Sequence, residues 1–476
     1  MIELEQEKVA DQLPLPDKPK LLSFSQLRKV FSDLRKKSWS KENQAPVFFT
    51  VSSITLSVAQ LISGIVIVHF ISPHDVGLWT SVCLALAYSF FLLAGVQNGL
   101  SRELPYYIGA GKDGMARRLA STTLFYTTGS CVLILLGGLA SVAFLIWKHS
   151  DPKLTYAVAA ITILIIFKFY QNYLFITFRS KNSFMDLARV QMWQGALMIV
   201  ALPLLFLGFG GLLLRFVIVG GLCLYLMHRV RPIIVSPIWK ADSFLLLLKT
   251  GIPIFATDYI FNCAGTLDKV ALLKFGGVEQ VGFYALAGSA SAAFAIIPQS
   301  IGHYVYPRMS HHYGRTNNPR VLWGLVWKTT LIVVASMIPI AVVGSLLLPF
   351  AVKILFPKYL AGTHAAQIAL FSTAIYGAST GAVALLSLKA WSHLVAQQLS
   401  FAALMAVAPF IGIRLFSSPL NGVAYGMLGA NLLGATLSLA ITFAATRRIH
   451  NMPPEPTAAE SLLEPGTGID TPAIEK

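Results

Sequence analysis

Long apolar stretches separated by short polar segments follow one another along most of the chain. A helix needs roughly 20 apolar residues to cross the hydrocarbon core of a bilayer. Stretches that approach or exceed this length lie near 47–70, 76–98, 119–147, 154–178, 187–207, 211–228, 251–273, 281–306, 322–350, 361–388, 394–413 and 421–446. Residues 195–227 are too long for one span, and Gly208–Gly211 is their natural break. The pattern therefore predicts an all-α integral membrane protein of about twelve transmembrane helices.

The composition supports a membrane protein and excludes a large water-soluble one. Of the 476 residues, 55% are hydrophobic and only 12% are charged, whereas soluble domains carry about a quarter charged residues. The formal net charge of +16 does not indicate nucleic-acid binding, because the basic residues lie between apolar stretches and form no face with interleaved aromatics. The four cysteines lie inside apolar stretches without CxxC spacing, so we expect neither a disulfide nor a metal site. Nothing in the sequence indicates a cofactor.

The distribution of lysine and arginine sets the predicted orientation, because cytoplasmic loops of membrane proteins carry the excess of these residues. With the N-terminus in the cytoplasm, 27 of the 37 lysines and arginines lie in cytoplasmic segments and six lie outside. Both termini are therefore predicted to be cytoplasmic, which requires an even number of spans. Arg215 lies at the start of a span and is expected to snorkel to the outer interface.

We divide the chain into two helical bundles flanked by polar tails. The predicted units are a cytoplasmic tail (1–45), a first six-helix bundle (46–233), a cytoplasmic linker (234–250), a second six-helix bundle (251–448) and a disordered cytoplasmic tail (449–476). In the first tail, apolar residues recur at helical spacing among basic ones, at Phe24, Leu27, Phe31 and Leu34. This segment is either an amphipathic helix on the anionic membrane surface or a partly disordered solvated tail.

An internal repeat relates the two bundles. A shift of 205 residues places His69–Trp79, which joins the first two spans, on Lys274–Tyr284, which joins the seventh and eighth. Phenylalanine, valine and glycine coincide, and tryptophan falls on tyrosine. Three identities in eleven positions are a weak signal, but each copy occupies the same place in its half. Because both halves begin in the cytoplasm, the repeat is parallel and predicts pseudo-symmetric bundles around a central cavity.

Polar side chains inside the spans are candidates for substrate contact, because each is costly in the membrane unless it faces water or a partner. A stripe on the seventh span follows i, i+4, i+7, i+11 spacing and consists of Asp258, Asn262, Gly265 and Lys269. The 205-residue shift carries this stripe onto Ser53, Ser57, Gln60 and Gly64 of the first span. The two stripes predict a hydrated cleft between the bundles. Alternatively, their small and polar residues merely let helices pack closely.

Ionisable groups within or beside the spans extend this candidate site. Lys168, with Asn172 one turn further, is expected either to face the cleft and attract a pyrophosphate or to snorkel. Asp258 is a candidate for ion coupling or for pairing with a cavity cation, but not with Lys269, which lies about three turns away on the same helix. Arg102 ends the second span, either as part of a substrate-access patch or as a helix anchor.

Three segments give the chain a resemblance to a known family. They are SPHDVGLW after the first span, GVQNGLSRELPYYIGAGK at the end of the second, and LLKTGIPIFATDYIFNCAGTLDKVALLKFGGVEQVGFYALA across the seventh. Residues 46–448 resemble the O-antigen and exopolysaccharide flippases of the multidrug/oligosaccharidyl-lipid/polysaccharide exporter (MOP) superfamily. The third segment is the most specific, although the family typically has Asp-Arg where this chain has Asp268 and Lys269.

The resemblance implies a role in surface polysaccharide biosynthesis without enzymatic activity. It implies two six-helix bundles that alternate access across the bacterial inner membrane, and an undecaprenyl-pyrophosphate-linked oligosaccharide as substrate. It also implies polysaccharide polymerase and other assembly proteins as partners. Family members often carry cationic residues in the cavity, but the first span here has no lysine or arginine. The positive charge must then come from Lys168, Lys269 or Arg102.

Three competing functions account for fewer of these features. A drug or cation antiporter of the same superfamily would need a carboxylate in the first bundle for proton exchange, and residues 46–70 contain no aspartate or glutamate. A membrane glycosyltransferase, polymerase or ligase would need paired carboxylates or a sizeable catalytic loop, but every predicted external loop has about a dozen residues or fewer. A scaffold would leave Asp258 and Lys168 unexplained.

Overall fold

The computed structural model describes residues 41–450 except 317–318, 378, 380 and 389. Every regular element in this part of the chain is a helix, which confirms the predicted all-α fold. The apolar repeat between Phe24 and Leu34 and the tail from 451 onward lie outside the described residues.

Two helices in the first half of the chain, α4 and α7, begin at recognisable capping residues. Ser72 caps α4 by accepting a hydrogen bond from the backbone N–H of Asp75 (3.2 Å), and Pro73 follows in the first turn, where no N–H is needed. Asp151 caps α7 in the same way. The elements are α3 (Lys41–Phe70), α4 (Pro73–Ser89), η1 (Phe90–Leu93), α5 (Val96–Gly109), α6 (Asp113–Trp147), α7 (Pro152–Ser180), α8 (Phe184–Val200), η2 (Leu202–Leu207) and α9 (Gly208–Arg229).

The second half of the chain contains a broken helix where the seventh span was predicted. Here α10 ends at Ala264 and a helix resumes at Leu267, so that Gly265 and Thr266 interrupt the span. Gly277, with a φ of 81°, then separates this short helix from the long remainder of α11, in a conformation that glycine adopts without strain. The elements are α10 (Ala241–Ala264), α11 (Leu267–Thr316), α12 (Pro319–Leu355), η3 (Pro357–Gly362), α13 (Thr363–Gly377), α14 (Gly381–Ser387), α15 (Trp391–Leu415) and α16 (Pro419–His450).

Within the described residues, nine helical segments are long and apolar enough to cross a membrane. One of them, Ala241–Ala295, contains the predicted span 251–273 and the first part of the predicted span 281–306. These segments confirm a multi-pass membrane protein built from transmembrane helices. The total of twelve spans, the bundle boundaries and the side of the membrane that each end faces stay predictions.

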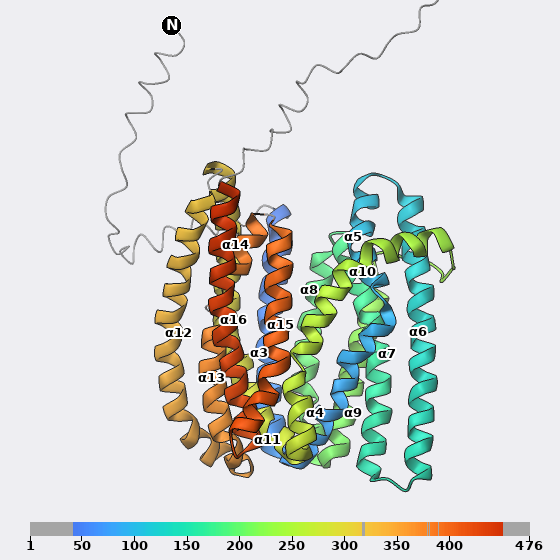
Figure 1. Cartoon of the computed structure of the whole chain (residues 1–476). Helices are drawn as coiled ribbons and strands as arrows, with labels where there is room; N and C mark the ends of the chain where they lie inside the picture. The colour runs from blue at the N-terminus through green and yellow to red at the C-terminus, as the bar shows by residue number, and fades with distance from the viewer. Residues whose placement is uncertain (1–40, 317–318, 378, 380, 389, 451–476) are drawn as a thin grey trace, which may run out of the picture.

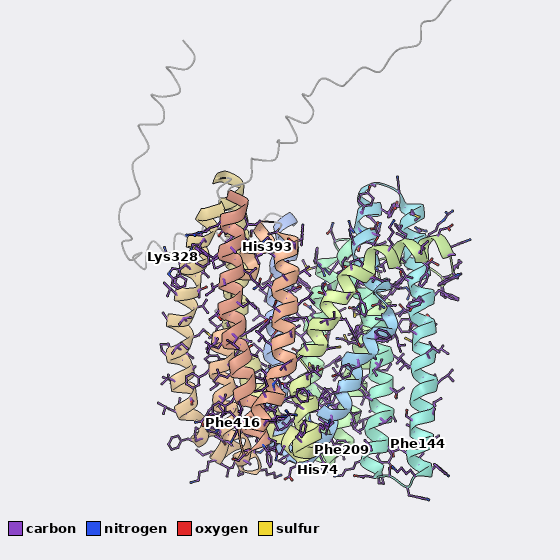
Figure 2. The ribbon with its side chains drawn as sticks, in the orientation of Figure 1. His74, Phe144, Phe209, Lys328, His393 and Phe416 are labelled. Carbon is purple, nitrogen blue, oxygen red and sulfur yellow. The ribbon has the colours of Figure 1, made fainter. Side chains whose placement is uncertain are left out.

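The helices stand in two groups with α10 running obliquely between them (Figure 1). Because α10 begins at Ala241, the end of the predicted linker 234–250 is helical. Helices of the two halves also pack together, since α4 contacts α11 and α5 contacts α10. The described start of α3 and the end of α16 lie at the same end of the molecule (Figure 1). We call the opposite end the far end; Figure 2 labels His74, Phe209 and Phe416 there.

Arg215 is buried within the first half of the chain. It is 1% exposed, and its Nη2 donates hydrogen bonds to Ser63 Oγ in α3 and to the backbone oxygen of Met198 in α8. The prediction that Arg215 snorkels to the outer interface is therefore wrong. The physical reason is that the Arg215 side chain points from α9 into the bundle. There the Ser63 hydroxyl and the carbonyl of Met198, in the last turn of α8, accept hydrogen bonds from its guanidinium group.

Ser63→Ala is expected to destabilise the protein more than Arg215→Met does. The first change leaves a buried guanidinium with one hydrogen bond fewer, which costs roughly 1–3 kcal/mol. The second removes the charge together with its need for partners, and an apolar side chain fills the space. Thermal unfolding of the purified protein in detergent measures both effects. The cost of Ser63→Ala should disappear in an Arg215→Met background, and an equal loss in both backgrounds would contradict this account.

Candidate functional site

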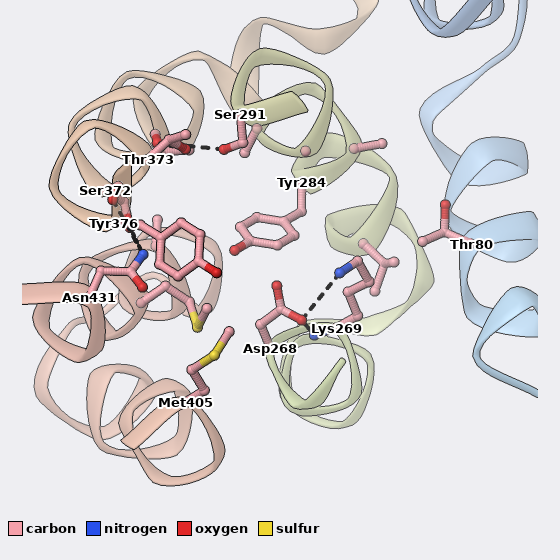
Figure 3. Close-up of a pocket in the computed structure, with 17 residues that line it drawn as sticks. Thr80, Asp268, Lys269, Tyr284, Ser291, Ser372, Thr373, Tyr376, Met405 and Asn431 are labelled. Carbon is pink, nitrogen blue, oxygen red and sulfur yellow. Dashed lines mark hydrogen bonds and ion pairs between the residues drawn. The ribbon is translucent and has the colours of Figure 1, made fainter. Parts of the chain in front are cut away.

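A polar cavity of about 280 Å³ lies in the second half of the chain (Figure 3). Its wall is formed by α11, α13, α15 and α16, and one residue of α4 lines it from the first half. The polar lining residues are Thr80, Asp268, Lys269, Tyr284, Ser291, Ser372, Thr373, Tyr376 and Asn431. Polar groups that converge on a cavity within apolar helices mark a candidate binding site.

Asp268 and Lys269 form the charged part of this cavity, just after the break in the seventh span. The carboxylate Oδ1 of Asp268 accepts hydrogen bonds from the backbone N–H of Lys269 (2.7 Å) and from its Nζ (3.3 Å). A carboxylate in the first turn of a helix is also stabilised by the helix dipole. The side chain of Asp268 is 8% exposed and that of Lys269 is 32% exposed. The carboxylate is thus buried, and the ammonium is the more accessible of the two charges.

Other polar residues of the cavity wall contact one another or face the charged pair. The Asn431 amide donates to Ser372 Oγ at 2.7 Å, which joins α16 to α13. Tyr284 is buried, and its hydroxyl points toward Asp268 across the cavity (Figure 3). The candidate site residues predicted from the sequence do not include Asp268, Tyr284 or Asn431. Asparagine within an apolar span is a signal that would have identified Asn431, whereas no feature of the sequence separates Tyr284 from other aromatic core residues.

A second cavity, of about 290 Å³, lies between α3 and α11. Three of the four residues in the predicted stripe on the first span line it, namely Ser57, Gln60 and Gly64. Ser53 does not, because its hydroxyl donates to Gln191 of α8. The lining residues of α11 continue from one cavity to the next, since Gly288 lines the first and Ala292 and Ala295 line the second. At i, i+4, i+7 spacing these three share one helix face, so the two cavities succeed one another along α11.

The other predicted site residues lie outside these two cavities. Asn172 belongs to a network in the first half, where its amide donates to Gln97 Oε1 (2.6 Å) and Gln97 donates to Thr127 Oγ1 (3.0 Å). This network joins α5, α6 and α7. The residues that line neither cavity and are exposed are Arg102, Lys168, Asp258 and Asn262. Their roles stay predictions, whereas Lys269 and Gln60 are both cavity-lining residues.

The two halves of the chain meet backbone to backbone at the far end. A Cβ atom on Gly77 would collide with the carbonyl oxygen of Val278, and one on Gly282 would collide with that of Pro73. The 205-residue shift maps Pro73 onto Val278 and Gly77 onto Gly282, so each contact is the counterpart of the other. Reciprocal contacts of this kind are what a two-fold axis between two repeats produces.

Hydrogen bonds reinforce the contact between the halves at the far end. The hydroxyl of Tyr359, which is fully buried, donates to the backbone oxygen of Ile71 (3.1 Å). His69 Nδ1 lies 2.7 Å from the backbone oxygen of Leu355. The end of α3 is thereby fixed to the segment around η3. These contacts hold the two halves together at the far end.

Solved transporter structures share this fold. No protein-family model matches the chain, and no curated protein sequence matches it. An inward-facing MATE family multidrug resistance transporter of the MOP superfamily superimposes with a TM-score of 0.65 at 13% identity, covering 85% of this chain and 98% of that one. The lipid II flippase MurJ in an inward closed conformation gives 0.64 at 15%, covering 85% and 90%. The Vibrio cholerae MATE transporter VcmN gives 0.55 at 15%, covering 89% and 100%. The chain thus has the fold of MOP superfamily transporters.

Proposed function

We propose that the chain is a flippase for a lipid-linked oligosaccharide. It moves an undecaprenyl-pyrophosphate-linked repeat unit from the cytoplasmic to the periplasmic leaflet of the bacterial inner membrane, for surface polysaccharide biosynthesis. The structural likeness to transporters, including a lipid II flippase, supports a transport function. The pyrophosphate and sugars would pass through the polar cavities, and the polyprenyl chain would stay in the lipid.

The observation that carries this proposal is the position of Lys269 in the polar cavity. The Lys269 side chain is partly exposed, whereas the side chain of the neighbouring Asp268 is buried. Opposite charges 4 Å apart attract by about 4 kcal/mol at an effective dielectric constant near 20, against about 1 kcal/mol in water. An accessible cation in a partly desolvated cavity therefore favours an anionic head group over a cationic drug.

Alternating access gives the contacts at the far end a role in the transport cycle. The cavities along α11 would receive the head group from the cytoplasmic side while the reciprocal glycine contact is closed. Separation of Gly77 from Val278 and of Gly282 from Pro73 would then open the far end, with the two halves rocking about the site between them. Both chain ends would face the cytoplasm, and a polysaccharide polymerase would use the substrate on the other side. Asp258 is the proposed coupling residue for an ion.

A drug antiporter is the second candidate function. The structural likeness to MATE multidrug transporters is as strong as the likeness to the flippase. An antiporter of cationic drugs would need an accessible carboxylate in the cavity, and Asp258 is exposed on α10. The position of Lys269 favours the flippase of these two candidates.

Deletion of the gene tests the proposal directly. We expect the deletion strain to lose its surface glycan and to accumulate lipid-linked repeat units on the cytoplasmic leaflet, because synthesis of the units continues without export. Extraction of the lipid-linked glycans, with a membrane-impermeant probe for their sidedness, measures this. Expression of the full chain from a plasmid should restore export. A deletion strain with normal surface glycan and raised sensitivity to cationic drugs would instead identify an antiporter.

A further inference from the structure

We propose that an apolar groove between α15 and α16 holds the polyprenyl chain of the flipped substrate, with Arg414 binding its phosphate at the far end. This inference rests on the proposed flippase function. It assigns a binding site for the lipid part of the substrate, outside the cavities that would take the head group.

The groove follows the line along which α15 and α16 pack. It has a volume of about 680 Å³. Its floor is narrow because the two backbones touch, with Gly412 against Gly422 and Gly426 against Ala408. A Cβ on Gly429 would meet no atom within 4 Å, so the groove is open at that point. Almost all lining residues are apolar, and a trough of this kind accepts a single hydrocarbon chain.

The groove and the polar cavity lie on two sides of the same helix pair. Met405 of α15 and Asn431 of α16 line the cavity, whereas the adjacent Leu404 and Ala430 line the groove. Side chains at the rim of the groove are exposed, with Val407 at 54%. Because α15 and α16 are membrane spans, an exposed apolar groove on them faces lipid. A chain in the groove would therefore remain in the bilayer while its head group is handled by the protein.

Arg414 supplies a positive charge at the far end of this groove. Val407, Ile411 and Arg414 follow i, i+4, i+7 spacing, so Arg414 continues the face of α15 that lines the groove. Arg414 is exposed in the last turn of α15, next to Phe416, which Figure 2 places at the far end. Phe416 also lines the groove and stacks on Tyr425 at a centroid distance of 4.5 Å. The guanidinium group binds phosphate through paired hydrogen bonds, so the site suits a chain that carries a phosphate at that end.

The first half of the chain offers a matched control. A second apolar groove, of about 450 Å³, lies along α8, η2 and α9 and is lined by Val200, Ala201 and Ile218 among others. Its helix α8 has no basic residue in its last turn. Bilayer lipids can fill either groove, but the groove of α15 and α16 combines the trough with an exposed arginine on the same face, whereas Arg215, the arginine of α9 beside the control groove, is buried. Selective binding of a polyprenyl phosphate should therefore depend on that groove alone.

Native mass spectrometry of the purified full chain tests this assignment. The protein is offered equal amounts of undecaprenyl phosphate and phosphatidylglycerol in detergent. We expect the wild type to retain undecaprenyl phosphate preferentially, and Gly429→Leu, which fills the groove, to retain about tenfold less. Arg414→Gln should lose a similar factor, because a hydrogen bond to a charged group is lost. Ala201→Leu in the control groove should bind as the wild type does.

Arg414→Gln keeps the test decisive if Gly429→Leu fails to insert, because Arg414 is exposed and fills no core position. Equal retention of the two lipids by the wild type would overturn the assignment, as would unchanged binding by Arg414→Gln. These outcomes would leave the flippase function untouched if the deletion strain still accumulates cytoplasmic lipid-linked glycan. Loss of that accumulation phenotype would instead reject the function itself.

Discussion

Gly282→Leu is expected to reduce export of the surface glycan about tenfold or more while the protein still reaches the membrane. The new side chain would meet the backbone carbonyl of Pro73, and a backbone atom cannot move aside as a flexible side chain can. Overpacking of a tight contact costs about 1–3 kcal/mol. The conformation that is closed at the far end is destabilised by this amount, so a smaller fraction of the molecules adopts it. A transporter that cannot close at the far end cannot complete its cycle. Surface glycan measured at matched protein levels records the loss.

The open far end of this variant should also be visible chemically. In a background without the native cysteines, a Thr80→Cys reporter in the polar cavity should react with a membrane-impermeant thiol reagent from outside more strongly when Gly282→Leu is present. Gly137→Leu is the matched control, because Gly137 is exposed on α6 with no atom within 4 Å of its would-be Cβ. Normal export by Gly282→Leu would show that the reciprocal contact is not a gate.

The length of the apolar stretches was sufficient to predict the long unbroken helices, but not the breaks within 76–98, 251–273 and 361–388. The stretch 394–413 corresponds to α15 (Trp391–Leu415), and 119–147 corresponds to α6 (Asp113–Trp147). This works because a helix in lipid must satisfy its own backbone hydrogen bonds over the full apolar length. The predicted repeat aligns Gly77 with Gly282, and the structure places these two glycines in neighbouring contacts; the symmetry of the two halves stays a prediction.

The interruption of the seventh span was not readable, because tertiary contacts support it. Thr266 lies at the break, and its hydroxyl is 3.0 Å from the hydroxyl of Tyr88 on α4, far away in the sequence. Arg215 illustrates the same limit. Its position at the start of a span indicated the membrane surface, and its burial depends on Ser63 and Met198 from two other helices.

Of the charged residues selected from the sequence, Lys269 lines the candidate site, whereas Arg102, Lys168 and Asp258 line neither cavity. Lys269 was selected because an ammonium group in a span is costly, and it lines the polar cavity. The sequence did not show that its partner would be the adjacent Asp268, or that Tyr284 would face that carboxylate. Those contacts arise from the short helix that follows the break and from the way the rest of α11 folds back beside it. They could not be derived from spacing along one helix.

Lys269→Ala is expected to lower export of the surface glycan about tenfold at unchanged protein levels. The substitution removes the accessible cation and leaves the carboxylate of Asp268 uncompensated in the cavity, where it repels a pyrophosphate. Loss of a hydrogen bond to a charged group costs about 1.5–3 kcal/mol, which corresponds to a loss of substrate affinity of about tenfold or more. Lys269→Arg should retain most of the export, because the charge stays. Lys168→Ala is expected to impair export as well if Lys168 faces the cleft.

The double variant Asp268→Asn/Lys269→Ala separates attraction from repulsion. If the uncovered carboxylate causes part of the defect, removal of both charges should restore part of the export that Lys269→Ala loses. Lys328→Ala is the matched control, since Lys328 is an exposed lysine on α12 that lines neither cavity. Export should be normal in that variant. Normal export by both Lys269→Ala and Lys168→Ala would refute the assignment of these lysines to the substrate path, because an anionic head group cannot cross apolar helices without a compensating charge.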